Sequence, residues 1–271
     1  MFGRRRFEVK TTDQLRHMRA AGLVVANALR AAAAATSPGA TTADVDRAAA
    51  RVIADAGAKP SFLGYHGYPA QVCVSVNDEV IHGIPGPRVL AVGDLVSIDC
   101  GAIVRGWHGD AAVTVACGGR TDDASARLSE VTKEALWAGI AAARVGATVG
   151  DIGHAVASTV AAAGEGYGIV DGFTGHGIGS AMHMDPDVPN VGRPGRGPRL
   201  VAGMAIAIEP MITLGGDDTD TLSDGWTVVT STGARAAHWE HTVAITPAGP
   251  WVLTAVDGGG LADGVALASL G

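Results

Sequence analysis

The stretch that decides the fold spans residues 95–115, LVSIDCGAIVRGWHGDAAVTV, in which two apolar runs flank a short turn. The runs 95–103 and 107–116 predict two β-strands, because β-branched and other apolar residues fill them and a glycine separates them. One carboxylate lies inside each run, Asp99 in the first and Asp110 in the second. We therefore expect an antiparallel hairpin that carries a buried aspartate on each arm.

The register of this hairpin determines how close the two aspartates come. A turn centred between Val104 and Arg105 would place Asp99 directly opposite Asp110 on one face, with Cβ atoms about 5 Å apart. Like charges at that distance are destabilising, and a cation between them would reverse the sign of the interaction. The alternative is a shifted register in which one aspartate faces solvent, since turn positions are the least certain part of such predictions.

Two glutamates occupy similar positions later in the chain. Glu209 ends the apolar run 204–208 and precedes Pro210, which favours an extended backbone at Glu209. Glu240 opens the strand-like run 241–245. Either glutamate alone could be an ordinary solvated acid. Four carboxylates in apolar strands without Lys or Arg are costly to bury, however, and two divalent cations would neutralise them. This pattern predicts a two-metal hydrolase.

Three histidines could complete such a site. His176 lies in the run GHGIG, residues 175–179, where glycines allow close backbone approach and imidazole is a common ligand for divalent metals. A phosphate-binding loop is disfavoured, because the run lacks both the P-loop lysine and the GxGxxG spacing. His82 and His183 have the chemistry to bind a substrate carbonyl or to carry protons. In isolation, each of these two could equally be a simple loop histidine.

Composition excludes several functional classes. The chain has 271 residues, 47% of them hydrophobic and 17% charged, which is typical of a folded globular protein. A net charge of −7 argues against nucleic-acid binding by bulk electrostatics. The cysteines Cys73, Cys100 and Cys117 form neither a disulfide framework nor a zinc knuckle. Without a signal peptide or an apolar run of about 20 residues, a cytoplasmic protein is expected. The basic cluster at residues 4–6 is expected to be a solvated terminus.

The order of predicted elements places the motifs along the chain. Thr12 or Asp13 is expected to cap the first helix and Thr42 the second, which should stop at Gly57. From Gly258 onward the tail has little to bury and is expected to be mobile. The predicted helices cover about 12–36, 42–57, 123–145 and 148–163; strands cover 71–76, 95–103 and 107–116; residues 169–257 are strand-rich, with a Pro/Gly loop at 185–199 and an acidic loop at 215–225.

The two halves of the chain repeat. The tripeptide Gly-Ala-Thr occurs at residues 39–41 and again at 146–148, an offset of 107, and Asp44 matches Asp151 at the same offset. The order of helix, helix and strands also occurs twice. We therefore predict a single pseudo-symmetric α+β domain over residues 1–257, with a site between its halves, where ligand pockets often form.

At this point the motifs match a known family. The chain resembles the type I methionine aminopeptidases of peptidase family M24, which have the creatinase-like pita-bread fold, over about residues 8–256. Each motif is weak alone, but the whole set in this order is specific. The matching stretches are LGYHGYP (63–69), IHGIP (81–85), SID (97–99), WHGD (107–110), GHGIG (175–179), IEPM (208–211), DGW (224–226) and EHT (240–242).

The resemblance implies a role for each matching residue. His82 would contact the peptide, His183 would polarise the scissile carbonyl, and Glu209 would accept the proton of the attacking water. Two divalent ions, Co, Mn, Fe or Zn, are implied as cofactors, and a monovalent cation is implied near Asn77, Glu79 and the backbone at Ala236. The implied metal ligands are Asp99, Asp110, His176, Glu209 and Glu240. The implied substrate-binding residues are Tyr65, Tyr68, Cys73, His82, His183 and Trp226, with Phe62 and Met182 as neighbours.

The implied activity is removal of the initiator methionine from nascent proteins whose second residue is small. The implied partners are nascent polypeptides, with transient ribosome contact, no specific nucleic acid, no membrane and a monomeric state. Three alternatives stay open. An aminopeptidase P or prolidase shares the fold but usually carries a large N-terminal domain, whereas the domain that bears the motifs here is expected to start within the first dozen residues. A metal-free binding protein of the same fold would have lost ligands that this chain retains. A purely structural globule with accidental acids is the third.

Overall fold

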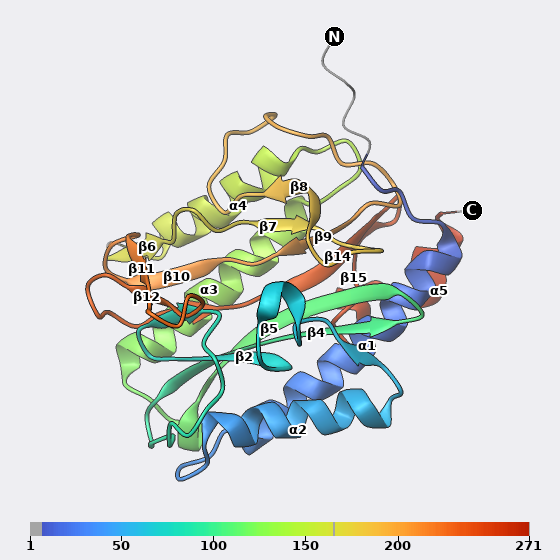
Figure 1. The fold of residues 1–271 in the computed structure, drawn as a ribbon. Coiled ribbons are helices and arrows are strands. Elements are labelled where there is room, and N and C mark those ends of the chain that lie inside the picture. The colour runs from blue at the N-terminus through green and yellow to red at the C-terminus, as the bar shows by residue number, and fades with distance from the viewer. Residues whose placement is uncertain (1–6, 165, 271) are drawn as a thin grey trace.

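The computed structural model describes residues 7–164 and 166–270, so the predicted solvated cluster at residues 4–6 lies outside the described part. Helix pair α1 and α2 lies on one side of the molecule and pair α3 and α4 on the other, with the strands between and in front of them (Figure 1). The helices are α1 (Thr12–Ala35), α2 (Thr42–Asp55), α3 (Asp123–Ala142), α4 (Val149–Ala162) and α5 (Asp263–Ala268). The mixture of helices and sheets confirms the predicted α+β class.

The strands form several small sheets. One sheet has the order β1-β4-β2 with β5 on β4, and a second has the order β15-β14-β9-β7-β8; two three-stranded sheets, β13-β10-β6 and β11-β12-β3, complete the set found in the described residues. The strands are β1 (Lys59–Pro60), β2 (Val72–Val76), β3 (Glu79–Ile81), β4 (Leu95–Val104), β5 (Trp107–Ala116), β6 (Tyr167–Ile169), β7 (Gly175–Gly177), β8 (Met184–Val188), β9 (Ala205–Ile208), β10 (Met211–Leu214), β11 (Thr219–Thr221), β12 (Val228–Thr230), β13 (Ala236–His238), β14 (His241–Thr246) and β15 (Gly249–Val252).

The hairpin of β4 and β5 corrects the predicted register. Arg105 and Gly106 form the turn with φ of 52° and 84°, and this left-handed pair is the conformation of a two-residue hairpin turn. The turn is therefore centred one residue later than predicted, and every partner shifts by two. Asp99 pairs with Ala112 and Asp110 pairs with Gly101. Because side chains alternate with period two, this even shift leaves both aspartates on the same face, as diagonal rather than direct neighbours.

Helix boundaries follow the predictions closely, except at the caps. Thr11, not Thr12 or Asp13, caps α1, because its hydroxyl accepts from the Gln14 amide while the Gln14 side chain accepts from the Thr11 amide. Thr41, not Thr42, caps α2. The apolar stripe of α1 is buried along its length, which packs this helix against the hairpin.

The sequence repeat is visible in matching hydrogen bonds. In the first half, the Gly39 amide donates to the Leu90 carbonyl at 2.9 Å, and the Leu90 amide donates to Ala40 at 2.8 Å. In the second half, Gly146 donates to Leu200 at 2.9 Å, and Leu200 donates to Ala147 at 2.8 Å. Each second helix is thus tied to a Pro- and Arg-containing loop in the same way, as expected for a pseudo-symmetric domain.

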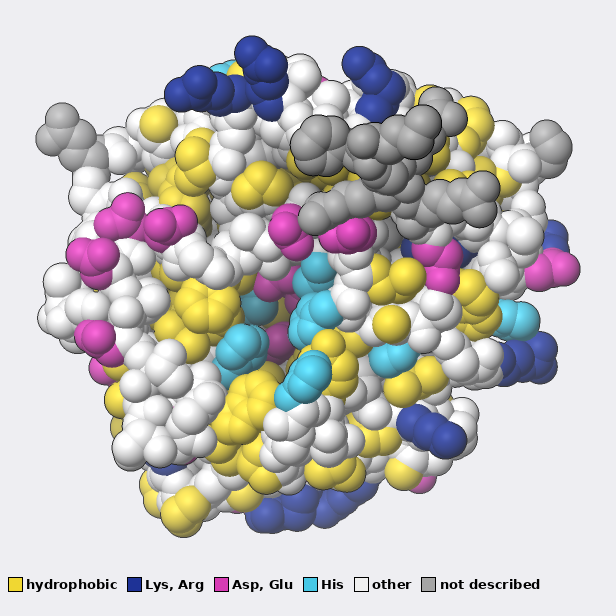
Figure 2. All heavy atoms as spheres, turned by 45° about the horizontal axis from the view of Figure 1, so that its top comes forward, with side chains coloured by type: hydrophobic (Ala, Val, Ile, Leu, Met, Phe, Trp, Pro, Cys, Tyr) yellow, Lys and Arg dark blue, Asp and Glu magenta, His cyan; other side chains and the backbone are white. Residues whose placement is uncertain are grey.

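The two halves join directly beside the aspartates. The amide of Glu240 donates to the carbonyl of Ala112 at 3.0 Å, and the Ala112 amide donates back at 3.3 Å. The Thr242 hydroxyl accepts from the Asp110 amide at 3.0 Å and donates to the Asp110 carbonyl at 2.8 Å. Near this seam the surface is hollowed, and histidine side chains surround the hollow with acidic side chains deeper inside (Figure 2).

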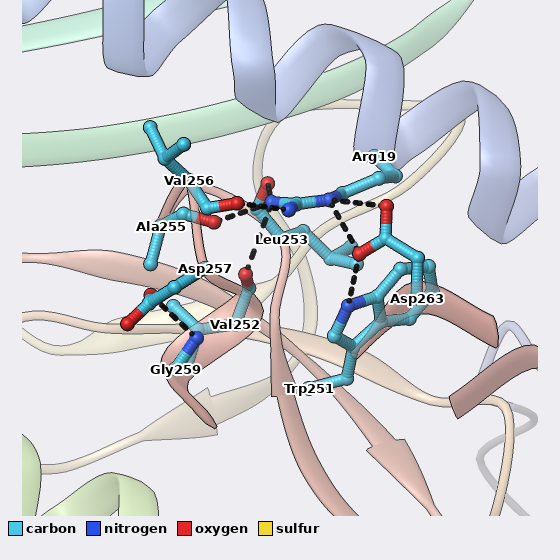
Figure 3. A network of polar contacts seen from close by, with 9 residues as sticks. All are labelled: Arg19, Trp251, Val252, Leu253, Ala255, Val256, Asp257, Gly259 and Asp263. Atoms are coloured by element: carbon cyan, nitrogen blue, oxygen red, sulfur yellow. Dashed lines mark hydrogen bonds and ion pairs between the residues drawn. The ribbon is translucent and has the colours of Figure 1, made fainter. Parts of the chain in front are cut away.

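Three further predictions are corrected. The predicted loop 185–199 contains most of β8, and the acidic loop 215–225 contains β11. The expectation that the tail has little to bury is wrong, because Ala266 of α5 is fully buried in an apolar cluster. Buried Arg19 of α1 also donates to the carboxylate of Asp263 and to the carbonyls of 252, 253, 255 and 256, so the tail is tied to α1 (Figure 3). The domain boundary at 257 and the mobility of the tail stay predictions.

No helix within residues 7–164 and 166–270 combines the length and apolar character needed to cross a bilayer. All three cysteines are buried as free thiols.

Candidate active site

One pocket gathers every side chain that was expected to bind the divalent metals or the substrate. The first half contributes residues from β2, β4, β5 and the loops beside them, and the second half contributes residues from β7 and from the segments next to β8, β9, β12 and β14. The pocket is lined by Phe62, Tyr65, Tyr68, Cys73, His82, Asp99, Asp110, His176, Met182, His183, Glu209, Trp226 and Glu240. Residues up to 178 positions apart in the sequence therefore meet in one place.

The floor of the pocket is formed by carboxylates that lack partners. Asp99 Oδ1, Asp110 Oδ1 and Glu240 Oε1 are buried without a hydrogen-bond partner among the described residues. Asp110, His176 and Glu240 each present one potential ligand atom, and these atoms all lie within 4.8 Å of one another. Unpartnered buried carboxylate oxygens are costly, so their convergence indicates a site for a cation.

The electrostatics of the pocket agree with that interpretation. Burial raises the pKa of Asp99, Glu209 and Glu240, each helped by the other carboxylates, and burial raises the pKa of Asp110 to about 7. The histidines supply no compensating positive charge, because burial lowers the pKa of His82 and His176 to about 4. Four acidic groups thus share a low-dielectric site without a protein cation, and divalent ions would restore their charged forms.

His176 is prepared to act as a metal ligand. Its Nδ1 lies 3.0 Å from the carbonyl oxygen of Gly177. Because a carbonyl can only accept, Nδ1 must carry the proton and donate it, which leaves the lone pair of Nε2 facing the pocket. That Nε2 lies 3.4 Å from Glu209 Oε1. Carboxylate and imidazole donors in this combination suit Mn, Fe, Co or Zn, so the residues present fit divalent metal ions.

The opposite wall of the pocket is apolar. Phe62, Tyr68, Cys73 and Met182 are buried together, with Trp226 against them. Cys73 is the strand partner of Asp99, and this register places the apolar wall beside the carboxylates. Tyr68 does not present its hydroxyl to the pocket, because it donates to the Gly83 carbonyl at 2.9 Å. A side chain bound here would therefore meet mainly ring and aliphatic surface.

His82 and His183 stand at the rim. The ring centre of His82 lies 6.2 Å from that of Trp226, and the ring of His183 meets that of His176 edge-to-face at 4.4 Å. Tyr65 Oη lies 2.8 Å from His183 Nδ1. Burial lowers the pKa of His183, so its imidazole is neutral near pH 7. The two loop histidines that the sequence left ambiguous thus both face the pocket.

One residue beside the site was not predicted. His238 is buried in β13, its Nε2 has no hydrogen-bond partner among the described residues, and that atom lies 3.7 Å from Glu209 Oε2. Glu209 therefore lies between two neutral imidazoles, His176 on one oxygen and His238 on the other. The signal that could have found it is spacing: His238 lies two residues before Glu240, the separation of side chains on one face of an extended strand.

The side chains implied for a monovalent cation lie outside this pocket and already have protein partners. Asn77 Oδ1 accepts from the Leu95 amide at 2.9 Å, and Glu79 pairs with Arg88 at 2.7 Å. A cation at this position would therefore depend on backbone carbonyl oxygens.

Comparisons with known proteins agree with this geometry. Residues 16–247 match the model of metallopeptidase family M24. Over 257 residues, the chain is 56% identical to methionine aminopeptidase 1 of Mycobacterium tuberculosis, which covers 93% of this chain and 96% of that protein. It is 50% identical over 247 residues to the methionine aminopeptidase of Clostridium acetobutylicum, covering 91% and 98% of the two chains.

Solved structures give the same result. The crystal structure of methionine aminopeptidase from Thermotoga maritima superposes with a TM-score of 0.89 at 41% identity, covering 92% of this chain and 99% of that chain. The prolidase of Pyrococcus furiosus superposes with a TM-score of 0.73 at 21% identity, covering 92% of this chain and 65% of that chain. The second likeness shows a shared fold only, and together the two confirm the predicted pita-bread architecture.

Proposed function

The chain belongs to metallopeptidase family M24 and acts as a metal-dependent methionine aminopeptidase, and we propose that the pocket described above is its active centre. One observation carries this assignment of the site. Unpartnered, buried oxygens of Asp99, Asp110 and Glu240 converge at one end of an apolar pocket, beside the lone pair of a neutral His176. Asp99, Asp110, His176, Glu209 and Glu240 would hold two divalent ions.

When bound, such ions supply Lewis-acid polarisation and make water acidic enough to lose a proton near neutral pH. Glu209 would accept that proton. Its carboxylate lies between the neutral imidazoles of His176 and His238, 3.4 Å and 3.7 Å away, which places a proton acceptor beside the proposed metal ligands. Among Co, Mn, Fe and Zn the donor set favours none.

The rim histidines would act on the peptide. We assign to His183 a hydrogen bond to the carbonyl oxygen of the scissile bond, which strengthens as negative charge develops on that oxygen. His82 would contact the peptide on the other side, next to Trp226. Both imidazoles are neutral near pH 7, so each can donate through one nitrogen and accept through the other.

The apolar wall explains the preference for methionine. Phe62, Tyr68, Cys73, Met182 and Trp226 form a slot of ring and sulfur surface, and an unbranched thioether packs well against aromatic edges. The carboxylates at the end of the slot would attract the free α-amine, which accounts for cleavage at the N-terminus. We propose the initiator methionine of nascent chains with a small second residue as the physiological substrate.

Several finer points stay predictions. They are the cytoplasmic location, the monomeric state, transient contact with the ribosome, the identity of the metal and the monovalent cation near Asn77. The nearest alternative is prolidase activity. The prolidase of Pyrococcus furiosus is only 21% identical to this chain, so the shared fold gives no argument about the substrate.

The assignment is tested by methionine release from the peptide Met-Ala-Ser. Metal-stripped protein should be inactive, Mn(II) or Co(II) should restore release, and Asp99→Ala or Glu209→Ala should abolish it. An Ala-Pro peptide provides the control for prolidase activity. Folded wild-type protein that releases no methionine with any of the four metals would contradict the proposal.

A further inference from the structure

Two neighbouring histidines in the pocket have different kinds of partner at the same ring nitrogen. His176 Nδ1 faces the carbonyl oxygen of Gly177 at 3.0 Å, whereas His183 Nδ1 faces the hydroxyl of Tyr65 at 2.8 Å. The rings meet edge-to-face with centroids 4.4 Å apart. The partner atom at Nδ1 decides which tautomer a neutral imidazole adopts, so the two rings need not be protonated alike.

The two partners have different hydrogen-bonding capacities. The carbonyl of Gly177 can only accept, so it fixes the proton of His176 on Nδ1 and exposes the Nε2 lone pair, as a metal ligand requires. The hydroxyl of Tyr65 can donate, and no described residue other than His183 shares a hydrogen bond with it. Donation from Tyr65 to His183 Nδ1 would place the proton of His183 on Nε2.

We infer that Tyr65 is a positioning residue for the hydrolytic reaction: its hydroxyl holds His183 in the Nε2–H tautomer, opposite to the tautomer of His176. The Nε2–H of His183 is then the group that donates to the oxygen of the scissile carbonyl. The reverse arrangement, with Tyr65 accepting from Nδ1–H, would direct the lone pair of Nε2 at the carbonyl oxygen, and two acceptors would repel. This inference rests on the role of His183 proposed above.

Further contacts restrict the geometry of this pair. The rings of Tyr65 and His183 also meet edge-to-face, with centroids 5.2 Å apart, and the ring of His66 meets that of Tyr65 edge-to-face at 4.4 Å. The Tyr65 ring is half-buried, and the short helical turn Tyr65–Gly67 holds its backbone. The phenol is therefore held in place before substrate arrives, and it does not have to be reoriented during the reaction.

The first experiment reads the tautomers directly. The full chain, with ¹⁵N-labelled histidine side chains and diamagnetic Zn(II), would be studied by long-range proton–nitrogen NMR, and the His183 signals would be assigned with His183→Ala. In the wild type, the His183 spectrum should show an unprotonated Nδ1 and a protonated Nε2. In Tyr65→Phe, a mixture of both tautomers is expected. Tyr68→Phe is the matched control, because its hydroxyl bonds to backbone instead, and it should leave the His183 tautomer unchanged.

The second experiment separates positioning from binding. Tyr65→Phe keeps the ring that lines the pocket, so kcat should fall about 10-fold while KM changes less than about twofold. In the His183→Ala background, Tyr65→Phe should have no further effect on kcat, because it acts through His183. Tyr167→Phe, at the remaining tyrosine, lies in β6 outside the pocket and should have wild-type kinetics.

The outcomes are distinguishable. A wild-type spectrum with the proton on His183 Nδ1, or a Tyr65→Phe spectrum identical to the wild type, would overturn the inference. Additive losses in the double variant would also overturn it, because they would give Tyr65 a role independent of His183. Wild-type kcat in His183→Ala would instead overturn the proposed role of His183, and the spectra would still decide the tautomer.

Discussion

The first half of the molecule (residues 12–116) and the second half (residues 123–252) start alike and end differently. In both, the second helix begins with a Thr-x-x-Asp capping box and is tied to a loop by the same pair of backbone hydrogen bonds. The first half then builds a regular hairpin of two ten-residue strands, whereas no strand of the described second half exceeds six residues.

This difference decides how each half presents its ligands. Asp99 and Asp110 project from the interior of two ten-residue strands that pair along their whole length. Glu209 follows the last residue of β9, Glu240 precedes the first residue of β14, and His176 is the centre of the three-residue strand β7. One half thus provides a rigid pair of carboxylates, and the other places its ligands at strand ends, where the backbone can bend toward them.

The largest effect on activity should come from removing a single proposed metal ligand, whichever half of the molecule supplies it. Asp110→Ala and Glu240→Ala should each lower kcat/KM for Met-Ala-Ser at least ~1000-fold, because a two-metal site needs charge from both sides. The far-ultraviolet circular dichroism of both variants should match that of the wild type. If Asp110→Ala abolished activity while Glu240→Ala retained more than a tenth of it, the second half would not be an equal contributor.

Metal affinity should rise with pH, because the buried carboxyl groups must lose their protons before they can bind a metal ion. Burial raises the pKa of Asp110 to about 7 in the metal-free protein, so this carboxyl carries a proton at pH 5.5 that a metal ion must displace. Affinity should therefore rise with pH, by roughly tenfold between pH 5.5 and 7.5 for each proton released. Calorimetric titration with Mn(II) at both values measures it.

The control for this measurement is Asp110→Asn, which cannot be protonated in that range. Its residual metal affinity should change less with pH than that of the wild type. A wild-type affinity that is flat or falling between pH 5.5 and 7.5 would contradict the inferred protonation of the carboxylates.

The seam between the halves should contribute a moderate amount of stability. Thr242→Val keeps the shape of the side chain but removes both hydrogen bonds to the Asp110 backbone in a buried setting. Leaving these groups unpaired should lower the free energy of unfolding by about 1–3 kcal/mol, measured by urea denaturation. Metal affinity should fall about tenfold, since Asp110 loses its support. Thr246→Val in the same strand removes a buried hydroxyl away from the ligands and should leave metal affinity unchanged.

The smallest effects should come from removing the aspartate of either capping box, and the loss of thermal stability should differ between the two. Asp44 accepts hydrogen bonds from Thr41, and Asp151 accepts them from Thr148 and also from the Gly195 amide of the neighbouring loop. Asp44→Ala should lower Tm by roughly 2 °C, and Asp151→Ala should lower it by more, without loss of catalytic activity in either variant. Equal shifts would show that the loop contact of Asp151 adds nothing to stability.

Local patterns were sufficient for much of the first half. Alternation of apolar residues predicted β5 at its exact bounds, and it placed Asp99 and Asp110 on a common face. That conclusion survived an error in the register, because the error was an even number of residues. Period-two patterns cannot locate a turn to one residue, since moving the turn by one residue shifts every partner by two and leaves each side chain on the same face. The left-handed pair at 105 and 106 is seen only in the folded hairpin.

Prediction of the metal ligands in the second half depended more on the resemblance of its motifs to those of a known family. Glu209, Glu240 and His176 lie where strands end or are very short, so no periodic pattern reports the direction of their side chains. The packing of the tail was missed for a related reason. The apolar residues of the segment 258–270 form no long periodic stripe, and they pack against α1 and β15 beside Arg19, which lies 244 residues before its partner Asp263.

The sequence by itself determined the chemistry and the local geometry: which residues can ligate a metal, the helices and their capping boxes, the hairpin and the repeat of the two halves. These follow from residue type and from periods of two or 3.6 residues, which act over short distances along the chain. Only the tertiary structure decided the hairpin register, the His238 contact with Glu209, the Thr242 seam and the opposite partners of His176 and His183. The hairpin register and the His176 contact with Gly177 are local but depend on how the backbone is held in the folded molecule. The Tyr65 contact with His183 and the Thr242 contact with Asp110 join residues 118 and 132 positions apart, which no local pattern reports.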